Sequence, residues 1–328
     1  MNSVFPISEA PGFPQAPPSA AETARFSDDV DRLAASIADV VVTAESKVRL
    51  ALAGLFSEGH ILLEDLPGVG KTLMGKTIAQ SIACDFKRIQ FTPDLLPSDV
   101  TGTTIFDVQA SRFEFVPGPV FSNVVLADEL NRTGPRTQSA LLEAMAEFQV
   151  SVDGEARPLP RPFFVIATQN LSESHGTFPL PDSQKDRFLI STGMGMPTAD
   201  QEMKILERSQ HGMPHAVPVI TAARVVEMQD TVKSVEITRL VRQYIVNIAR
   251  ATRAHPVVRY GLSPRGGAAL QRAAQCWAAF EGRPYVIPED VSAVAAHVIP
   301  HRLMLNPGSD ASAPATVTDI LETVRVPA

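Results

Sequence analysis

Residues 62–72 of the chain read Leu62-Leu63-Glu64-Asp65-Leu66-Pro67-Gly68-Val69-Gly70-Lys71-Thr72. The apolar run that ends at Leu63 predicts a short buried strand. The run breaks at Pro67-Gly68, and a helical pattern resumes at Lys71. A strand, a glycine-containing loop and a helix in this order are the setting that a phosphate-binding loop requires.

This loop offers several groups to an anion. Glycines permit backbone angles that a Cβ forbids, so successive amide N–H groups can turn inward. The helix N-terminus adds unpaired donors and a partial positive charge. Lys71 can reach the outer phosphates of a nucleotide, and the Thr72 hydroxyl can join the shell of a Mg²⁺ ion. The predicted nucleotide-binding residues of the loop are Gly68, Val69, Gly70, Lys71, Thr72 and Leu73.

One position departs from the full loop pattern. The pattern has glycine where this chain has Asp65, so the first turn of the loop must differ. An ordinary strand-to-helix turn is the alternative interpretation of a glycine-rich turn. The Gly-Lys-Thr sequence between a strand and a helix favours nucleotide binding over that alternative.

Composition narrows the class of protein. Of the 328 residues, 45% are hydrophobic and 20% charged, which predicts a packed core in one large domain or two smaller ones. The formal net charge of −7 argues against a nucleic-acid clamp, because binding to phosphate backbones needs a basic face. No apolar run reaches membrane-spanning length, and no signal pattern opens the chain. Cys84 and Cys276 lie far apart, which predicts buried thiols in a reducing cytoplasm.

Histidines recur with a spacing known from metal sites. His211 and His215, and likewise His297 and His301, are four residues apart. Prolines interrupt both segments, so we expect solvated loop histidines rather than metal ligands.

The N-terminal part divides into a tail and a helical segment. Residues 1–25 are rich in proline and alanine and are expected to be a disordered tail. Residues 26–56 carry a helical apolar pattern. Within them, Val41 and Val42, beside Val40, either form an apolar wall for an adenine ring or belong to the core.

A second strand predicts catalytic acids. Residues 124–127 are small or apolar and are followed by Asp128 and Glu129. Ligands of open α/β sheets bind at the carboxyl ends of the strands, where these acids stand. Asp128 can hold Mg²⁺ through water, and Glu129 can polarise the water that attacks a γ-phosphate. A surface turn with two solvated acids is the alternative.

Other segments supply further candidates. Residues 103–116 predict one hairpin, and the alternation of Val150 and Val152 into Asp153-Gly154 predicts a second. A buried strand over residues 163–168 ends near Asn170, whose amide can hydrogen-bond the attacking water or simply favour a turn. Arg187 is either a surface ion-pairing residue or an arginine that points into the site of a neighbouring subunit.

The pattern from residue 197 onward is helical. A helix over residues 238–254 is expected to bury Leu240, Val241, Tyr244, Ile245 and Ile248. Ser263-Pro264 starts another helix, and Arg265 falls in its first turn. A cation is unfavourable there by about 0.3–1 kcal/mol, which indicates an anionic partner such as a nucleotide phosphate or a nearby acid.

These residues together resemble the MoxR family of AAA+ ATPases. The likeness runs from about Phe26 to the end of the chain. Its most specific stretches are residues 91–99 (FTPDLLPSD), 127–132 (ADELNR), 137–145 (TQSALLEAM) and 167–170 (ATQN).

The resemblance implies an α/β fold, with a P-loop AAA+ αβα core around a parallel five-stranded sheet and a C-terminal all-helical lid domain. It implies a core over residues 26–195 and a lid over residues 196–328. The family roles carried over to this sequence are Walker A for Lys71 and Thr72, Walker B for Asp128 and Glu129, sensor 1 for Asn170, arginine finger for Arg187 and sensor 2 for Arg265. The hairpins resemble inserts that face the pore or the client.

We therefore expect a cytoplasmic, Mg²⁺-dependent ATPase that works as a homo-oligomeric ring, a hexamer. The family implies a protein client and a partner with a von Willebrand A domain, and no nucleic acid is expected. A nucleotide-gated scaffold without hydrolysis and a nucleic-acid motor are alternatives from other classes. The sequence also leaves open a chelatase-like motor that inserts a metal.

Overall fold

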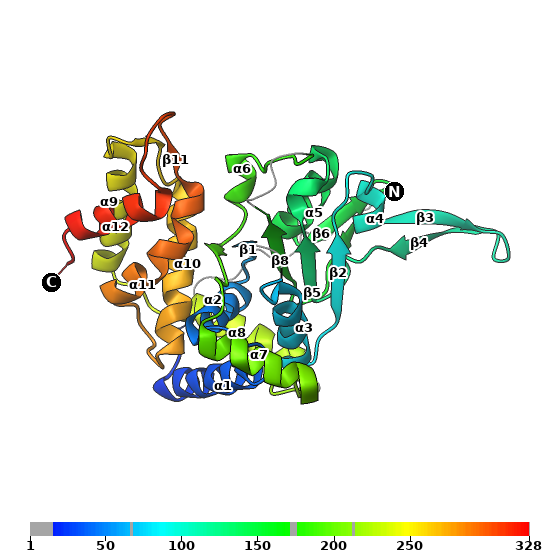
Figure 1. Ribbon diagram of the computed structural model, residues 1–328, viewed down its shortest axis with the longest axis horizontal. Helices are drawn as coiled ribbons and strands as arrows, with labels where there is room; N and C mark the ends of the chain where they lie inside the picture. The colour runs from blue at the N-terminus through cyan, green and yellow to red at the C-terminus, as the bar shows by residue number, and fades with distance from the viewer. Residues whose placement is uncertain (1–15, 66–67, 171–175, 212–213, 328) are drawn as a thin grey trace, which may run out of the picture.

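The computed structural model describes residues 16–65, 68–170, 176–211 and 214–327. A five-stranded parallel sheet forms its centre, in the order β2-β5-β8-β1-β9 (Figure 1). The strands are β1 (Ile61–Glu64), β2 (Phe86–Gln90), β5 (Val124–Asp128), β8 (Phe164–Gln169) and β9 (Ile190–Thr192). All five point the same way, so their carboxyl ends share one edge of the sheet.

Two hydrophobic cores cover the two faces of the sheet. Because strand side chains alternate, Leu62 and Val125 face one core while Leu63 and Leu126 face the other. The first core includes α5 (Pro135–Glu147) and α4 (Pro97–Thr101). The second includes α2 (Glu45–Phe56) and α3 (Lys71–Ser81). The predicted αβα arrangement is thereby confirmed.

The N-terminal helix begins earlier than the sequence pattern predicted. Helix α1 (Ala20–Ala38) starts with Ser19, whose side chain accepts a hydrogen bond from the Glu22 N–H, while the Glu22 carboxylate accepts one from the Ser19 N–H. Residues 20–25 are therefore helical, and the expected boundary of a disordered tail at residue 25 is wrong. The described helix ends at Ala38, and residues 39–44 separate it from α2.

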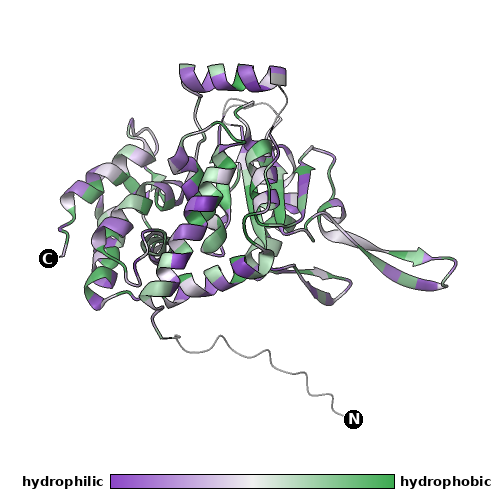
Figure 2. Cartoon of the chain, turned by 90° about the horizontal axis from the view of Figure 1, so that it is seen from below, coloured by the Kyte–Doolittle hydropathy of each residue, from purple (hydrophilic) through white to green (hydrophobic). Residues whose placement is uncertain are grey.

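Both predicted hairpins are present. Strands β3 (Gly102–Asp107) and β4 (Arg112–Pro117) pair antiparallel, as do β6 (Gln149–Val152) and β7 (Glu155–Pro158). The β3–β4 hairpin reaches away from the body of the molecule (Figure 2). Phe106 and Phe113 pack edge to face on it, although 51% and 73% of their surfaces are exposed.

The C-terminal region is helical, as predicted, with one short addition. Its helices are α7 (Ala199–His211), α8 (Ala222–Ser234), α9 (Arg239–Ala254), α10 (Pro264–Phe280), α11 (Pro288–Val298) and α12 (Ala313–Thr323). A two-stranded ladder of β10 (Val258–Tyr260) and β11 (Met304–Leu305) is added to them. Within the described residues, no helix combines the length and apolar character needed to cross a bilayer.

Helix α9 shows where the expected burial was wrong. Val241, Tyr244, Ile245 and Ile248 are buried as predicted, but Leu240 is 60% exposed. The buried residues recur every three or four positions, and Leu240, in the first turn, lies outside the arc that they cover.

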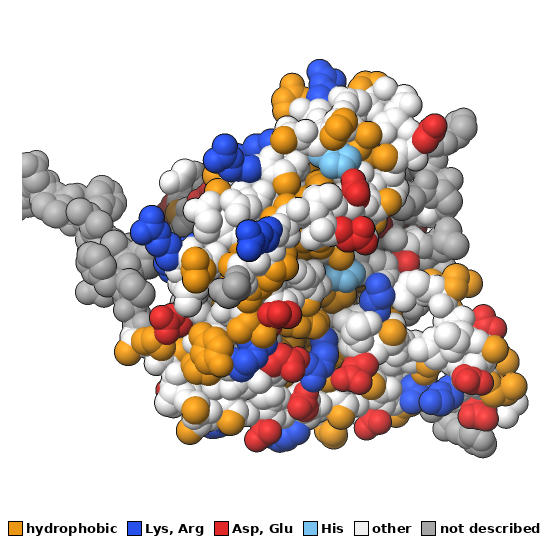
Figure 3. Space-filling model, turned by 90° about the vertical axis from the view of Figure 1, so that its left-hand side faces the viewer, with side chains coloured by type: hydrophobic (Ala, Val, Ile, Leu, Met, Phe, Trp, Pro, Cys, Tyr) orange, Lys and Arg blue, Asp and Glu red, His pale blue; other side chains and the backbone are white. Residues whose placement is uncertain are grey.

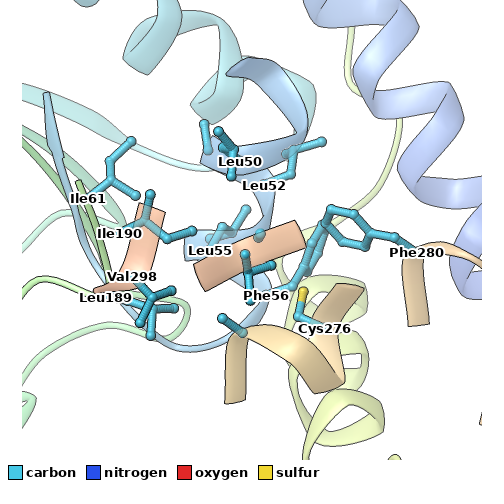
Figure 4. Packing of buried hydrophobic residues seen from close by; sticks show 14 of the residues in the cluster. Leu50, Leu52, Leu55, Phe56, Ile61, Leu189, Ile190, Cys276, Phe280 and Val298 are labelled. Atoms are coloured by element: carbon cyan, nitrogen blue, oxygen red, sulfur yellow. The ribbon is translucent and has the colours of Figure 1, made fainter. Parts of the chain in front are cut away.

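The C-terminal helices share a core with the N-terminal helices and the sheet. Phe56 of α2 packs against Phe280 of α10, while Ile61 and Ile190 of the sheet lie in the same cluster as Val298 of α11 (Figure 4). This common core fixes the C-terminal helices beside β9, at one edge of the sheet.

Candidate nucleotide-binding site

A cavity of about 660 Å³ lies at the carboxyl edge of the sheet. Its wall is built from the predicted glycine loop, the two predicted acids and Asn170, together with residues 40–43 and the segment that leads into α7. A volume of this size suits a small-molecule ligand.

The loop before α3 has the backbone that the sequence predicted. Gly68 and Gly70 have φ angles of +88° and +92°, and Gly70 is the N-cap of α3. A Cβ built on either glycine meets no atom within 4 Å, so the backbone angle, rather than space, is what favours glycine. Val69, Lys71, Thr72 and Leu73 line the same cavity. Leu66 and Pro67 lie outside the described residues.

Asp65 explains how the first turn of the loop departs from the usual pattern. Its carboxylate accepts hydrogen bonds from the backbone N–H groups of Met194 and Gly195, the second at 3.2 Å. Its backbone carbonyl accepts a hydrogen bond from Lys71 Nζ at 3.3 Å. The acid thus ties the phosphate loop to the segment between β9 and α7, whose residues 194–197 also line the cavity.

The two predicted acids stand at the end of β5 within a network of polar side chains. Asp128 accepts from Thr168 Oγ1 at 2.7 Å on one oxygen and from Arg88 Nη2 at 2.6 Å on the other. The backbone N–H of Glu129 donates to the same Thr168 hydroxyl at 2.8 Å. Glu129 has a φ of 58°, and this left-handed backbone turns its side chain out of the strand.

Two residues of β2 belong to this network and were missed. Arg88 binds Asp128, and Gln90 Nε2 donates to Glu129 Oε2 at 2.7 Å. Arg132 also lies 3.2 Å from the Glu129 carboxylate. The only signal for them was that the polar residues Arg88 and Gln90 alternate along the segment that forms β2, which pairs with β5.

Asn170 is brought to the cavity from the end of β8. The residue is 5% exposed, and its backbone carbonyl accepts from Asn131 Nδ2 at 3.3 Å. It lines the same cavity as Asp128 and Glu129, in agreement with the expectation that a ligand binds at the carboxyl ends of the strands.

The far end of the cavity is apolar. Val41, Val42, Met194 and Ile205 all line it. Val41 is only 2% exposed and belongs to the main core, as the alternative interpretation expected, while contact of Val41 and Val42 with an adenine ring stays a prediction. Arg208 of α7, which was not predicted, donates to the Val40 carbonyl at 3.0 Å and closes this end.

The residues present fit a Mg²⁺–nucleotide complex. The loop amides, Lys71 and the N-terminus of α3 suit phosphates, and the hydroxyl and carboxylate oxygens of Thr72 and Asp128 are ligands that Mg²⁺ prefers. His211 and His297 lie in helices α7 and α11 rather than in loops. His301 is buried, contrary to the expectation of a solvated loop, and no metal-binding group of His, Cys, Asp and Glu is found in the described part of the chain.

Comparison with known proteins places the chain in a family. A model of the ATPase family associated with various cellular activities (AAA) matches residues 60–190, and a model of the AAA lid domain matches residues 250–324. Chaperone MoxR1 of Mycobacterium tuberculosis is 37% identical over 95% of this chain and 86% of its own length. The chain belongs to the MoxR family of AAA+ ATPases.

Other relatives extend this likeness. The Bacillus subtilis protein YeaC is 50% identical over 85% of this chain and 88% of its own length. A crystal structure from Cytophaga hutchinsonii superposes with a TM-score of 0.87 at 35% identity, covering 94% of this chain and 98% of that one. The chain is thus a relative of chaperone-like AAA+ ATPases along nearly all of its length.

Two predicted residues lie outside the cavity of this MoxR-family chain. Arg187 donates from Nη1 to the Leu142 carbonyl of α5 at 2.7 Å. Arg265 is exposed in the first turn of α10, after the N-cap Ser263. Neither lines the cavity of its own subunit, so their roles toward a nucleotide stay predictions.

Proposed function

We propose that this chain binds ATP with Mg²⁺ in the cavity at the carboxyl edge of the sheet and hydrolyses it to ADP and phosphate. One observation carries the proposal: the glycine loop, two acids and Asn170, which come from three separate strands, line a single cavity. Membership of an AAA+ ATPase family supports the same conclusion.

Each residue has a part that follows from its place. The amides of residues 68–73 and the Lys71 ammonium would hold the phosphates, while Thr72 and Asp128 would hold Mg²⁺. Mg²⁺, when bound, supplies positive charge to the phosphate oxygens. Val41 and Val42 would flank the base.

Glu129 is the proposed general base. Its carboxylate stands at the cavity, held by Gln90, and a carboxylate so placed can accept a proton from the attacking water. Asn170, buried at the neighbouring strand end, would orient that water or the γ-phosphate through its amide.

A single subunit does not complete this site. Arg187 lies away from its own cavity, so we propose that it acts in the cavity of a neighbouring subunit within a homo-oligomeric ring, a hexamer. Arg265 would sense the phosphates from the lid. The proposed core covers residues 26–195, extended at its start by α1 to Ala20, and the proposed lid covers residues 196–328.

The work done by hydrolysis is proposed from the relatives and from the hairpin. We propose chaperone-like remodelling of a client protein, with a von Willebrand A domain protein as partner and metal insertion as one form of the reaction. The exposed Phe106 and Phe113 of the β3–β4 hairpin supply an apolar contact for a client. On the face shown in Figure 3, acidic and basic side chains are interspersed, which does not favour the nucleic-acid alternative.

Phosphate release by the Glu129→Gln variant tests the proposal. The variant should bind ATP like the wild type and release phosphate at least about 100-fold more slowly, the scale of a lost general base. Glu322→Gln, an exposed acid on α12, is the control and should leave the rate unchanged. Wild-type binding of ATP without phosphate release would instead support the nucleotide-gated scaffold.

A further inference from the structure

An arginine of the C-terminal region is buried against the segment that precedes β9. Arg302 belongs to a short 3-10 turn (Pro300–Arg302), and its side chain is 3% exposed. Its Nε donates to Asp186 Oδ1 at 2.7 Å, and its Nη1 and Nη2 donate to the carbonyls of Leu189 and Phe188. The guanidinium of Arg302 therefore contacts Asp186, Phe188 and Leu189, which lie within four residues of the end of α6 (Asp182–Lys185).

Asp186 and Arg302 form an ion pair at 2.7 Å, which we call the clasp. Burial lowers the pKa of Arg302 to about 10, and the Asp186 carboxylate opposes that change, so the guanidinium is charged at neutral pH. A buried cation that loses its carboxylate is costly, so the two residues are expected to move as a unit.

The clasp also contacts the start of α10. Asp186 Oδ2 accepts from Ser263 Oγ, the N-cap of α10, at 3.4 Å. A Cβ built on Gly266 would lie 3.0 Å from Arg302 Cδ, which shows that the first turn of α10 packs directly on the arginine. Lid residues therefore touch both members of the pair.

Arg187 is the next residue after Asp186. Its guanidinium turns the other way, to the Leu142 carbonyl of α5. The backbone that carries Arg187 is thus fixed by the lid on one side, while its side chain rests on the core on the other. A displacement of Arg302 would therefore move the backbone that carries Arg187.

We propose that the Asp186–Arg302 clasp is the positioning contact by which the lid of one subunit sets the place of Arg187 in the cavity of the next. The inference rests on the proposed ring and on the proposed role of Arg187. A purely structural ion pair would weaken every activity of the subunit that carries it. A positioning pair would weaken only the hydrolysis that the next subunit performs.

Mixed assemblies can separate these two effects. Glu129→Gln subunits keep Arg187 but lack the base, so they serve as donors of the arginine. Arg187→Ala subunits keep Glu129 and serve as acceptors. Phosphate release should be low for each alone and recover when the two are mixed. Arg302→Met is then placed in the donor or in the acceptor, because methionine removes the cation and keeps a long unbranched side chain, and the Asp186 carboxylate left behind is 21% exposed.

The expected result is asymmetric. In the donor, Arg302→Met should lower phosphate release by at least about tenfold, since small misplacements of a catalytic group cost about that much or more. In the acceptor it should lower the rate by less than about twofold. Asp186→Asn, which keeps the acceptor atom and removes the charge, is the second variant and should show the same asymmetry.

The control uses the same substitution at another ion pair of the lid. Arg283 donates two hydrogen bonds to the buried Asp290, and Arg283→Met should show no difference between donor and acceptor. Equal losses in both placements for Arg302→Met and Asp186→Asn, or no loss in either, would overturn the clasp. Full activity of Arg187→Ala alone would overturn the role of Arg187 itself, which is a separate result.

Discussion

At the scale of single residues, both carboxylate oxygens of Asp128 already accept hydrogen bonds. A metal ion bound to Asp128 would use the same oxygens. Arg88 donates two hydrogen bonds to one Asp128 oxygen, and Thr168 donates to the other. A cation at that carboxylate competes with any second cation for the same charge. Arg88 therefore stands where its side chain would weaken the binding of the proposed Mg²⁺ ion.

We predict that Arg88→Ala lowers the Mg²⁺ concentration needed for half-maximal binding of a fluorescent ATP analogue. The Arg88 side chain is 47% exposed, and an ion pair of that kind contributes about 0.2–1 kcal/mol, so the shift should not exceed about fivefold. Lys87→Ala, an exposed neighbour on β2, should leave the midpoint in place. A higher Mg²⁺ requirement in Arg88→Ala would show that the arginine assists the metal instead.

At the scale of elements, α1 joins the N-terminal part of the chain to the lid. Phe26 packs against both Phe56 of α2 and Phe280 of α10, and Ser27 Oγ donates to the Phe280 carbonyl at 2.6 Å. The start of this helix depends on the reciprocal hydrogen bonds between Ser19 and Glu22.

We predict that Ser19→Ala lowers the free energy of unfolding by about 1 kcal/mol, the usual cost of a lost N-cap. Ser36→Ala, in the last turn of the same helix and far from the N-cap, should be neutral or slightly stabilising, because alanine has the higher helix propensity. Urea denaturation of both variants gives the comparison. Equal effects of the two substitutions would mean that the cap contributes nothing.

At the scale of the whole molecule, buried histidines make stability depend on pH. His60 is 2% exposed, accepts from the Val165 N–H at 3.0 Å and lies 3.1 Å from the Met145 carbonyl. Burial lowers its pKa from 6.5 to about 4, with the Met145 carbonyl opposing. His60 therefore binds a proton near pH 6.5 in the unfolded chain but only near pH 4 in the folded chain. The free energy of unfolding consequently falls as the pH falls between these two values.

We predict that about 2 kcal/mol of stability is lost through His60 between pH 7.5 and pH 5. His60→Gln should have the lower stability at pH 7.5 and a flatter pH dependence, measured by urea unfolding at both pH values. The lowered pKa of His301 acts in the same direction in both proteins and does not affect the difference. Parallel pH profiles for the two proteins would contradict this assignment.

Some residues of the fold and the site could be predicted from the sequence, and others could not. The apolar run before Asp128 and the Gly-Lys-Thr turn placed β5 and the loop correctly, because a fully buried strand leaves an unbroken apolar pattern. Arg88 was missed because a charged residue on an edge strand has the same pattern as a solvated one. Leu240 was misplaced because the limits of a buried arc depend on the neighbouring helices, which a single helix pattern does not contain.

The central claim is that a nucleotide binds where the loop amides and Lys71 converge. Calorimetric titration of the full chain with ATP and Mg²⁺ tests it most directly, with Lys71→Ala beside the wild type. We predict saturable heat in the wild type and at least about tenfold weaker binding in Lys71→Ala, since a charged contact to phosphate is worth about 1.5–3 kcal/mol. Absence of binding heat in the wild type, or equal affinity in the two proteins, would contradict the account.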